Sequence, residues 1–346
     1  MRILRSFLAL AALGLAAGPL GAQQSLTGAG ATFPAPIYQK WFAEYARAHN
    51  VRVNYQAIGS GGGIRQYTEG TVDFGASDGP MTDTMIAAVG GNVVHIPTVL
   101  GAVVITYNLP SLGATKLRLD GATIADIFQG RITRWNDPRI AALNPGVALP
   151  AMDMVVVHRS DGSGTTYVFT DFLSKVSPDW KSSVGNAVSV NWPTGLGGKG
   201  NEGVTQQVRQ LEGSVGYVEL VYAISNRLPY ALVKNAAGQY VEPTLESVSA
   251  AAAGARLAPT TDFRVSITNA AGRTSYPISS FTWLLIRKDN PDAAKARAIR
   301  DFLNWMISPA AQEMTKPLAY APLPQPVVEL VRARLRTLTA NGQPIR

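Results

Sequence analysis

Apolar residues follow two different spacings along the chain, and the two spacings alternate. Alternating or continuously apolar stretches predict β-strands at residues 51–55, 72–74, 103–108, 154–157 and 281–286. Helical spacing of apolar residues predicts helices at 37–48, from 64 onward, at 166–176 and at 294–307. Strands that alternate with helices favour an α/β fold with parallel strands.

The first of these helices is predicted to be amphipathic. Its apolar face is predicted to consist of Ile37, Trp41, Tyr45 and Ala48. Thr32 stands where an N-cap residue belongs, and Pro34 falls within the first turn. Farther along the chain, residues 247–262 are rich in Ala and poor in large apolar groups, which predicts a helix on the surface.

Three glycine-rich turns each follow a predicted strand and precede a predicted helix, near residues 28–33, 59–63 and 161–165. Ligands of parallel α/β sheets bind outside the carboxyl ends of the strands. A helix N-terminus offers unpaired N–H groups and a partial positive charge, which suit an anion. We therefore expect the three turns to converge on one cleft that holds an anion.

The segment at residues 159–165, Arg-Ser-Asp-Gly-Ser-Gly-Thr, is the most informative of these turns. Ser163 and Thr165 supply hydroxyl groups, and the Arg159 guanidinium can donate two parallel hydrogen bonds. Taken alone, the segment is equally consistent with a well-capped loop that binds nothing. His158 precedes it and carries no predicted role.

Residues 1–22 have the pattern of a cleaved secretory signal. Arg2 and Arg5 precede an apolar run at 7–17 that is too short to span a bilayer, and small residues follow as far as Ala22. A membrane anchor fits less well, because glycine and proline interrupt the run. The chain has no Cys, so it has neither disulfides nor a site for a lipid anchor. These features predict a periplasmic protein.

More than 300 residues remain after the signal, which is enough for two lobes. The strand at 103–108 is predicted to cross into a second lobe, and the strand at 281–286 to lie in the first lobe again. The expected first lobe comprises residues 23–105 and 277–346, and the second comprises 106–276. Two lobes joined by crossing strands make a hinge.

The charge and motifs of the chain weaken other classes of function. Loss of Arg2 and Arg5 with the signal lowers the formal charge of +8 by two, to +6, and the basic residues are scattered without interleaved aromatics, which argues against nucleic-acid binding. Gly162-Ser163-Gly164 lacks the Gly-x-Ser-x-Gly spacing of a hydrolase nucleophile elbow. With three His residues and no metal-ligand spacing, no metal site is predicted, and His95 is expected to be a core residue.

Two further classes of function stay open as alternatives. Gly195–Gly200 contains a Lys but lacks the Gly-Lys-Ser/Thr sequence of a P-loop, so nucleotide binding has little support. A structural or adhesive surface protein is disfavoured by several glycine-rich turns that face one cleft.

Five segments together resemble the periplasmic phosphate-binding proteins of bacterial high-affinity phosphate ABC importers (the PstS family). These segments are 26–36 (LTGAGATFPAP), 59–63 (GSGGG), 72–78 (VDFGASD), 161–165 (DGSGT) and 195–201 (GLGGKGN). The resemblance runs from about Ser25 into the C-terminal region. It implies a two-lobed α/β fold with a central mixed β-sheet flanked by helices in each lobe, and a ligand cleft between the lobes.

The resemblance also implies a set of phosphate-binding residues: Thr32, Phe33, Ser60, Asp78, Arg159, Asp161, Ser163, Gly164 and Thr165. In this set Arg159 is the single cation, Asp161 is its partner, and Asp78 is a carboxylate that faces the ligand. The implied function is capture of inorganic phosphate by hinge closure, with delivery to the permease and ATPase of an importer. No catalysis, cofactor or nucleic-acid partner is implied, and we expect a monomer.

The carboxylate of Asp78 has a physical explanation in that setting. A buried carboxylate beside an anion is unfavourable unless it is paired. Phosphate carries a proton that it can donate to Asp78, whereas sulfate carries none at neutral pH. Sulfate would therefore set two acceptors against each other. Without the other motifs, Asp78 would be interpreted as part of an ordinary turn before Gly79-Pro80.

Overall fold

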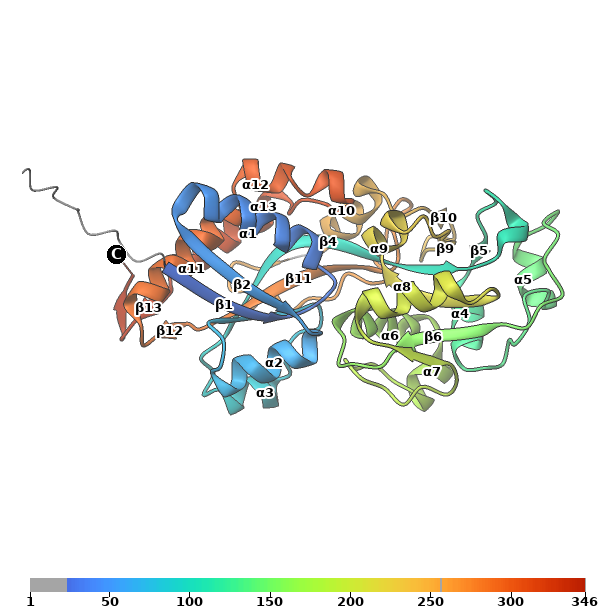
Figure 1. The fold of residues 1–346 in the computed structure, drawn as a ribbon, viewed down its shortest axis with the longest axis horizontal. Coiled ribbons are helices and arrows are strands. Elements are labelled where there is room, and N and C mark those ends of the chain that lie inside the picture. The colour runs from blue at the N-terminus through green and yellow to red at the C-terminus, as the bar shows by residue number, and fades with distance from the viewer. Residues whose placement is uncertain (1–23, 256, 346) are drawn as a thin grey trace, which may run out of the picture.

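Two lobes lie side by side along the long axis of the molecule in the computed structural model, which describes residues 24–255 and 257–345 (Figure 1). The predicted signal segment, residues 1–22, lies outside the described residues. Within those residues, no helix is long and apolar enough to cross a membrane.

The elements alternate between strands and helices, as the apolar pattern predicts. The strands are β1 (Gln24–Gly30), β2 (Val51–Ala57), β3 (Phe74–Ser77), β4 (Val94–Tyr107), β5 (Arg118–Leu119), β6 (Val155–Arg159), β7 (Leu196–Gly198), β8 (Ser214–Glu219), β9 (Leu232–Lys234), β10 (Tyr240–Val241), β11 (Ser279–Ile286), β12 (Asp289–Asn290), β13 (Thr339–Ala340) and β14 (Gln343–Pro344). The α-helices are α1 (Ala35–His49), α2 (Ser60–Glu69), α3 (Asp83–Ala88), α4 (Gly121–Phe128), α5 (Pro138–Leu143), α6 (Gly164–Val176), α7 (Pro178–Ser183), α8 (Gly200–Gln210), α9 (Leu220–Ser225), α10 (Leu245–Ala253), α11 (Ala293–Met306), α12 (Pro309–Glu313) and α13 (Gln325–Leu335).

One long strand, β4, joins the sheets of the two lobes. The strands lie in the order β2-β1-β3-β11-β4-β8-β6-β7, and all fourteen residues of β4 are buried. From Val94 to Ala102 the strand pairs antiparallel with β11, and from Val103 onward it pairs antiparallel with β8. The chain that returns to the first lobe lies beside the point where β4 changes partner, because the Val103 amide donates to the Ile278 carbonyl oxygen at 2.9 Å. Two adjacent crossings of this kind are the construction of a hinge.

Parallel and antiparallel pairs occur in both halves of the sheet. In the first half β1 lies parallel to β2 and β3, and β11 runs antiparallel to β3. In the second half β6 lies parallel to β7 and β8. The predicted mixed α/β fold with two lobes is confirmed.

Helix α1 differs from its prediction at both ends. Ile37, Trp41 and Tyr45 are buried as expected, but Ala48 is exposed because it falls in the last turn, beyond the packed part of the helix. The cap prediction for Thr32 is wrong as well. The Thr32 carbonyl oxygen, not its hydroxyl, accepts the Ala35 amide at 3.1 Å, and the hydroxyl oxygen accepts hydrogen bonds from Asn201 instead.

Other boundaries also differ from their predictions, most of all the start of β4, which lies at Val94 rather than at 103. Helix α2 begins at Ser60 rather than 64, so the glycines at 61–63 lie inside its first turn, and β3 begins at Phe74 rather than at 72. Helix α6 begins at Gly164 rather than 166.

Helix α10 corrects the prediction of a surface helix at residues 247–262. It is capped by the Thr244 side chain and ends at Ala253. Val248, Ala251 and Ala252 are buried, in a helix that contacts β4 and β11. Small side chains here permit close packing on the sheet, so a low content of large apolar residues does not mean exposure.

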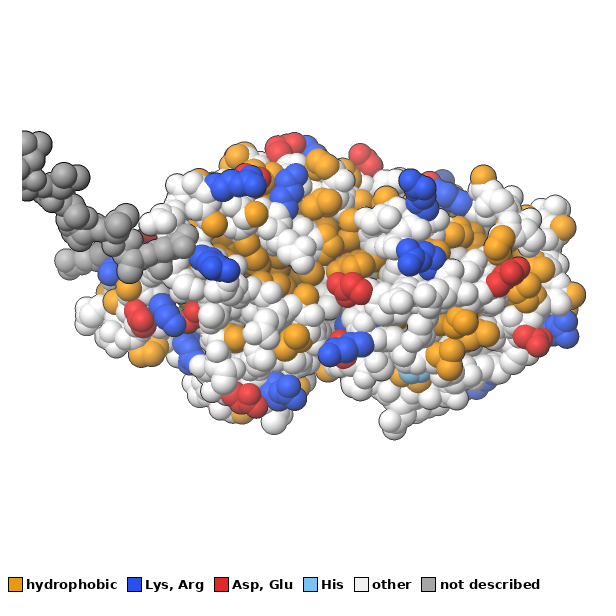
Figure 2. All heavy atoms as spheres, in the orientation of Figure 1, with side chains coloured by type: hydrophobic (Ala, Val, Ile, Leu, Met, Phe, Trp, Pro, Cys, Tyr) orange, Lys and Arg blue, Asp and Glu red, His pale blue; other side chains and the backbone are white. Residues whose placement is uncertain are grey.

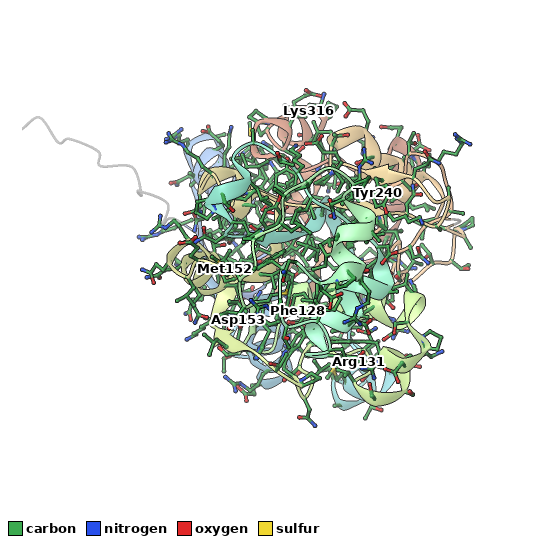
Figure 3. All side chains as sticks on the ribbon, turned by 90° about the vertical axis from the view of Figure 1, so that its right-hand side faces the viewer. Phe128, Arg131, Met152, Asp153, Tyr240 and Lys316 are labelled. Atoms are coloured by element: carbon green, nitrogen blue, oxygen red, sulfur yellow. The ribbon has the colours of Figure 1, made fainter. Side chains whose placement is uncertain are left out.

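An aromatic cluster fills the core of the second lobe. Phe128 of α4 packs edge-on against Phe169 of α6, with ring centroids 4.7 Å apart, and Phe169 stacks on Tyr217 of β8 at 4.4 Å. Figure 3 views this lobe end-on and labels Phe128, which is completely buried, and Arg131, whose side chain is half exposed. The cluster holds α6 and β8 in place, and α6 begins at the boundary between the lobes.

Because α2 packs closely on β1, adding one methyl group at Gly63 is predicted to destabilise the fold strongly. A Cβ on Gly63 would lie 2.4 Å from the Gly30 Cα and 2.6 Å from the Ala29 carbonyl oxygen. We expect Gly63→Ala to lower the free energy of unfolding by about 1–3 kcal/mol, measured by urea denaturation. Gly254→Ala is the control, because its nearest heavy atom would lie at 3.6 Å and its backbone is helical. Equal stability of Gly63→Ala and the wild type would contradict this packing.

Candidate functional site

The three glycine-rich turns meet at the boundary between the lobes. The Gly61 amide donates to the Gly162 carbonyl oxygen at 2.8 Å, which joins the turn at 59–63 to the turn at 161–165. Thr32, which follows β1, accepts hydrogen bonds from Asn201 of the second lobe. The predicted convergence of the turns is therefore present in the structure.

Arg159 and Asp161 form a two-pronged ion pair at this boundary. The Arg159 Nε and Nη2 donate to the two Asp161 carboxylate oxygens at 2.7 and 2.5 Å, and the Arg159 side chain is only 1% exposed. Burial opposes ionisation of Asp161, but the hydrogen bonds and charge of Arg159 outweigh it and lower the pKa of that carboxyl. The Gly200 amide also donates to Asp161, at 3.0 Å. The cation is thereby oriented and largely neutralised.

Backbone amides from both lobes remain available as donors. Ser163 caps α6 by accepting the Thr166 amide at 3.0 Å, which leaves its own hydroxyl proton free to donate. In the described part of the chain, the buried amides of Thr32, Phe33, Gly164 and Thr165 have no protein acceptor. Buried donors of this kind cost about 1–3 kcal/mol each when unsatisfied. They lie at the carboxyl end of β1 and at the start of α6, where an anion is favoured.

Asp78 is the acceptor within this set of donors. It follows β3 and is 1% exposed, with Oδ1 accepting the Thr282 hydroxyl at 2.7 Å and Oδ2 accepting the Ser60 hydroxyl at 3.5 Å. A Cβ on Gly164 would lie 2.4 Å from Asp78 Oδ2, so the carboxylate directly faces the N-terminus of α6. Burial raises the pKa of Asp78 to about 7, against the opposing effects of Thr282, Arg159 and Ser60.

Asn201 is a buried link between the lobes that was not among the predicted site residues. Its Nδ2 donates to the Thr32 hydroxyl oxygen at 2.8 Å and to the Thr165 hydroxyl oxygen at 3.1 Å. The signal in the sequence was the 195–201 segment, which supported the family resemblance without a role for its Asn. Spacing alone does not show that the first turn of α8 reaches across the cleft.

Two other buried polar residues also escaped prediction. Thr282 lies in the middle of β11, in an apolar stretch that reads only as a buried strand. Glu219 ends β8, is completely buried, and accepts the Val221 amide at the start of α9 at 2.8 Å. Burial raises the pKa of Glu219 well above its usual range. Neither position belongs to a glycine-rich motif, so neither carried a local signal.

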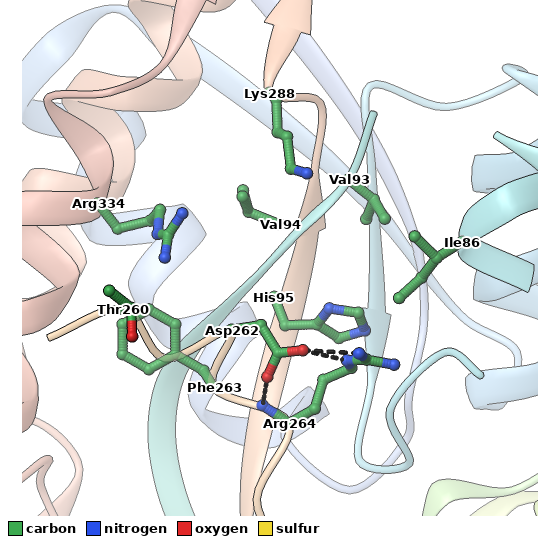
Figure 4. Close-up of a pocket in the computed structure, with 10 residues that line it drawn as sticks. All are labelled: Ile86, Val93, Val94, His95, Thr260, Asp262, Phe263, Arg264, Lys288 and Arg334. Carbon is green, nitrogen blue, oxygen red and sulfur yellow. Dashed lines mark hydrogen bonds and ion pairs between the residues drawn. The ribbon is translucent and has the colours of Figure 1, made fainter. Parts of the chain in front are cut away.

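The histidines do not form a catalytic cluster with Ser163. His95 is buried, and its Nε2 accepts the Met81 amide at 3.0 Å, so the core role expected for it is confirmed. Its ring lines a separate cavity of about 240 Å³ beside the loop after Asp78 (Figure 4). His158 stacks on Trp192, with ring centroids 4.8 Å apart.

Comparisons with known proteins agree with this architecture. The PBP superfamily domain matches residues 16–310. A phosphate-binding protein PstS from Xylella fastidiosa is 46% identical over 308 residues, which cover 89% of this chain and 84% of that protein. Another PstS, from Methanocaldococcus jannaschii, is 38% identical over 322 residues, covering 87% and 83%. The chain belongs to the PstS family.

Solved structures support the fold of this PstS-family chain. The phosphate-binding protein from Stenotrophomonas maltophilia superimposes with a TM-score of 0.70 at 20% identity, over 92% of this chain and 96% of that one. A phosphate ABC transporter substrate-binding protein from Clostridium perfringens, solved with bound phosphate, superimposes with a TM-score of 0.64 at 16% identity, over 87% and 100%. At these identities the likeness shows the fold alone.

The contact between Gly164 and Asp78 gives a test of the closed arrangement in this PstS-family chain. We expect Gly164→Ala to separate the lobes, because the added Cβ would lie 2.4 Å from Asp78 Oδ2 and 2.5 Å from the Ser60 hydroxyl oxygen. Gly164 is the first residue of α6 and its φ is not positive, so the helix accommodates Ala there and each lobe should keep its fold. In saturating inorganic phosphate, small-angle scattering should give the variant a larger radius of gyration than the wild type has. The circular dichroism spectrum should be unchanged. Identical scattering curves would refute the contact.

Proposed function

We propose that this protein binds inorganic phosphate between its two lobes and delivers it to an ABC-type importer. The proposed ligands are Thr32, Phe33, Ser60, Asp78, Arg159, Asp161, Ser163, Gly164 and Thr165. Support comes from the family, from relatives named as phosphate-binding proteins, and from the convergence of these residues at the lobe boundary.

The observation that carries the proposal is the buried Asp78 carboxylate, which faces many hydrogen-bond donors. Asp78 faces the start of α6, where amides and hydroxyls can hold the oxygens of an anion. A tetrahedral anion with an O–H group satisfies both kinds of partner, since its O–H donates to Asp78 and its other oxygens accept from the donors. Phosphate has that proton at neutral pH and sulfate lacks it. A site built on such a buried hydrogen bond discriminates by roughly 10⁴-fold or more.

Hinge closure is the proposed mode of capture. Residues 23–105 and 277–346 form the first lobe in this proposal, and residues 106–276 form the second. Thr32, Ser60 and Asp78 then belong to the first lobe, and Arg159 to Thr165 belong to the second. A ligand that bridges both sets stabilises the closed form, which is a shift of population between two states.

The proposed setting is the periplasm, and the proposed partner is the importer. Residues 1–22 would direct the chain to the periplasm, where it would act as a monomer that docks on the permease of the importer with its ATPase. Lys and Arg side chains are scattered over both lobes on the face in Figure 2 rather than gathered in one patch, which is consistent with a small anionic ligand rather than nucleic acid. The site residues bind and do not react with the ligand.

Replacement of the carboxylate should abolish the selectivity against sulfate. Asp78→Asn presents an N–H₂ group to the anion, so sulfate no longer meets an acceptor and its affinity should approach that of phosphate. Calorimetric titration with each anion at pH 8 measures the ratio. Asp73→Asn is the matched control, since Asp73 lies at the other end of β3 and pairs with Lys295. Unchanged selectivity for phosphate over sulfate in Asp78→Asn would contradict the proposed role of the carboxylate.

The selectivity of the wild type should depend on pH. Burial raises the pKa of Asp78 to about 7, so the carboxyl is ionised above that pH and protonated below it. Only the protonated carboxyl can donate to sulfate. Sulfate affinity should therefore rise about fivefold from pH 8 to pH 7 and about tenfold from pH 8 to pH 6, and level off at lower pH, following the protonated fraction of the carboxyl. The Asp78→Asn variant should show no such rise, and a flat wild-type profile would contradict the mechanism.

A further inference from the structure

Asn201 has every polar atom of its side chain fixed by a neighbour. It is 0% exposed, and its Oδ1 accepts the Glu219 amide at 2.9 Å. Because an amide N–H cannot accept, this contact fixes the side-chain oxygen toward Glu219 and the Nδ2 group toward the two threonines. The Asn201 backbone amide adds a second donor to the Thr32 hydroxyl oxygen, at 3.2 Å.

These contacts determine the direction of two hydroxyl groups. A hydroxyl has one proton to donate and two sites that accept. Both accepting sites of the Thr32 hydroxyl are occupied by Asn201 N–H groups. The Thr165 hydroxyl oxygen accepts from Asn201 Nδ2 and from Arg159 Nη1, at 3.1 and 3.3 Å. Since neither neighbour can accept a proton, each hydroxyl must donate its own proton elsewhere.

We propose that Asn201 is a positioning residue that fixes the hydroxyls of Thr32 and Thr165 as donors toward the bound anion. This inference rests on the proposed function. It assigns Asn201 a share in specificity, because hydroxyls locked as donors cannot accept a second proton from the ligand. Dibasic phosphate, whose one proton goes to Asp78, then fits better than monobasic phosphate, whose second O–H would face a donor.

The arrangement also depends on closure. Thr32 follows β1 in the first lobe, whereas Asn201 and Thr165 begin α8 and α6 in the second. Separation of the lobes would remove both Asn201 donors from the Thr32 hydroxyl and let it rotate. The donor set is therefore completed only when the lobes meet.

The test is phosphate titration of three variants from pH 6 to 8. Asn201→Ala should bind about 10- to 100-fold more weakly and with a flatter pH profile than the wild type, because the freed hydroxyls can accept a ligand proton. Asn201→Asp is nearly isosteric, and its second oxygen would take the threonine protons, so it should bind more weakly still. Thr205→Val is the matched control, because Thr205 is buried in the same helix and its hydroxyl has no partner in the described chain. It should match the wild type.

The outcomes separate the two proposals. If the wild type binds phosphate while Asn201→Ala and Asn201→Asp keep its affinity and pH profile, the proposed role of Asn201 is contradicted. The proposed phosphate-binding function is then retained. A loss of affinity with an unchanged pH profile makes Asn201 a structural residue and also overturns the inference. If the wild type binds no phosphate, both proposals fall. Circular dichroism checks folding, and the isosteric Asn201→Asp decides the case if Asn201→Ala does not fold.

The cavity beside His95 supports a second, independent inference. Ile86, Val93, Val94 and Phe263 give it an apolar wall, and Lys288 and Arg334 line it as well. Figure 4 shows the His95 ring between Lys288 and the Asp262–Arg264 pair. At about 240 Å³ the cavity is smaller than the roughly 300–1,000 Å³ that drug-sized ligands occupy.

His95 presents a donor to this cavity. Its Nε2 accepts the Met81 amide, so the proton of the neutral ring sits on Nδ1, which has no partner among the described residues. The ring is neutral because burial, reinforced by the charge of Arg264, lowers the pKa of His95 to about 4. Arg264 is paired with Asp83 and Asp262, whereas Lys288 and Arg334 form no ion pair within the described chain.

We infer that the cavity binds a compact organic carboxylate, with its hydrocarbon part on the apolar wall and its charge toward His95 Nδ1, Lys288 and Arg334. Two cations without an ion-pair partner in the described chain, of which Arg334 also donates to the Thr261 carbonyl oxygen at 2.8 Å, and an N–H donor are partners that a carboxylate prefers. The apolar wall excludes inorganic phosphate as the matching ligand, because phosphate has no hydrocarbon part to bury.

Benzoate is the probe, with inorganic phosphate saturating throughout so that the cleft between the lobes is occupied. Benzoate should bind and shift the ¹⁵N signal of His95 Nδ1, and its neutral analogue benzyl alcohol should not. Lys288→Gln with Arg334→Gln should weaken benzoate binding at least tenfold, whereas the equally charged control Lys40→Gln with Lys181→Gln should keep it. The inference is overturned by no benzoate binding, by equal binding of benzyl alcohol, or by equal binding in the two double variants.

Discussion

The burial of two opposite charges at one boundary is the constraint on which the rest of this structure depends. Arg159 and Asp78 are both almost completely buried, and a buried charge must be paired or hydrogen-bonded. Asp161 pairs with the cation through two hydrogen bonds, and the hydroxyls of Thr282 and Ser60 hold the carboxylate. The partners come from distant parts of the chain, so the charges are satisfied only when β3, β6 and β11 are in place.

Close approach of backbone segments is what brings those charges together. A Cβ on Gly59 would lie 2.3 Å from Asp161 Oδ2, and one on Gly164 would lie 2.4 Å from Asp78 Oδ2. Gly59 also has a φ of +90°, a conformation that residues with a side chain rarely adopt. The glycines therefore serve two purposes here, since they permit the turns and leave room for the two lobes to meet.

The apolar pattern predicts the strands and helices well where burial alone decides them. Strand β11 and helix α11 match their predictions within two residues, because Phe281 to Ile286 are buried and one face of α11 is buried along its length. That face comprises Ile299, Phe302, Leu303 and Met306. Helix starts at glycine-rich turns are predicted less well. In α2 and α6 the first helical residues are small and polar and have no apolar spacing, so the pattern places both starts too late.

The same reasoning explains which site residues the sequence could indicate. Residues in the glycine-rich turns carry a local signal, and the turns do converge. Thr282 and Glu219 carry none, because each stands in an apolar strand. Thr282 gains its role from Asp78, 204 residues away, whereas the contact of Glu219 with Val221 is local. Asn201 lies between these cases, since its motif is visible while its contact with Thr32, 169 residues away, is not.

The contact between Asn201 and Thr32 links ligand binding to closure of the lobes. In the second lobe, the Thr165 hydroxyl is already fixed by Asn201 and Arg159 of the same lobe. In the first lobe by itself, the Thr32 hydroxyl can rotate and can donate or accept equally well. Contact across the boundary removes that freedom through Asn201 N–H groups that can only donate. The conformational entropy of the Thr32 hydroxyl is then lost in the closure step rather than in the binding step, so the closed cleft meets its ligand with the directions of these hydrogen bonds already set.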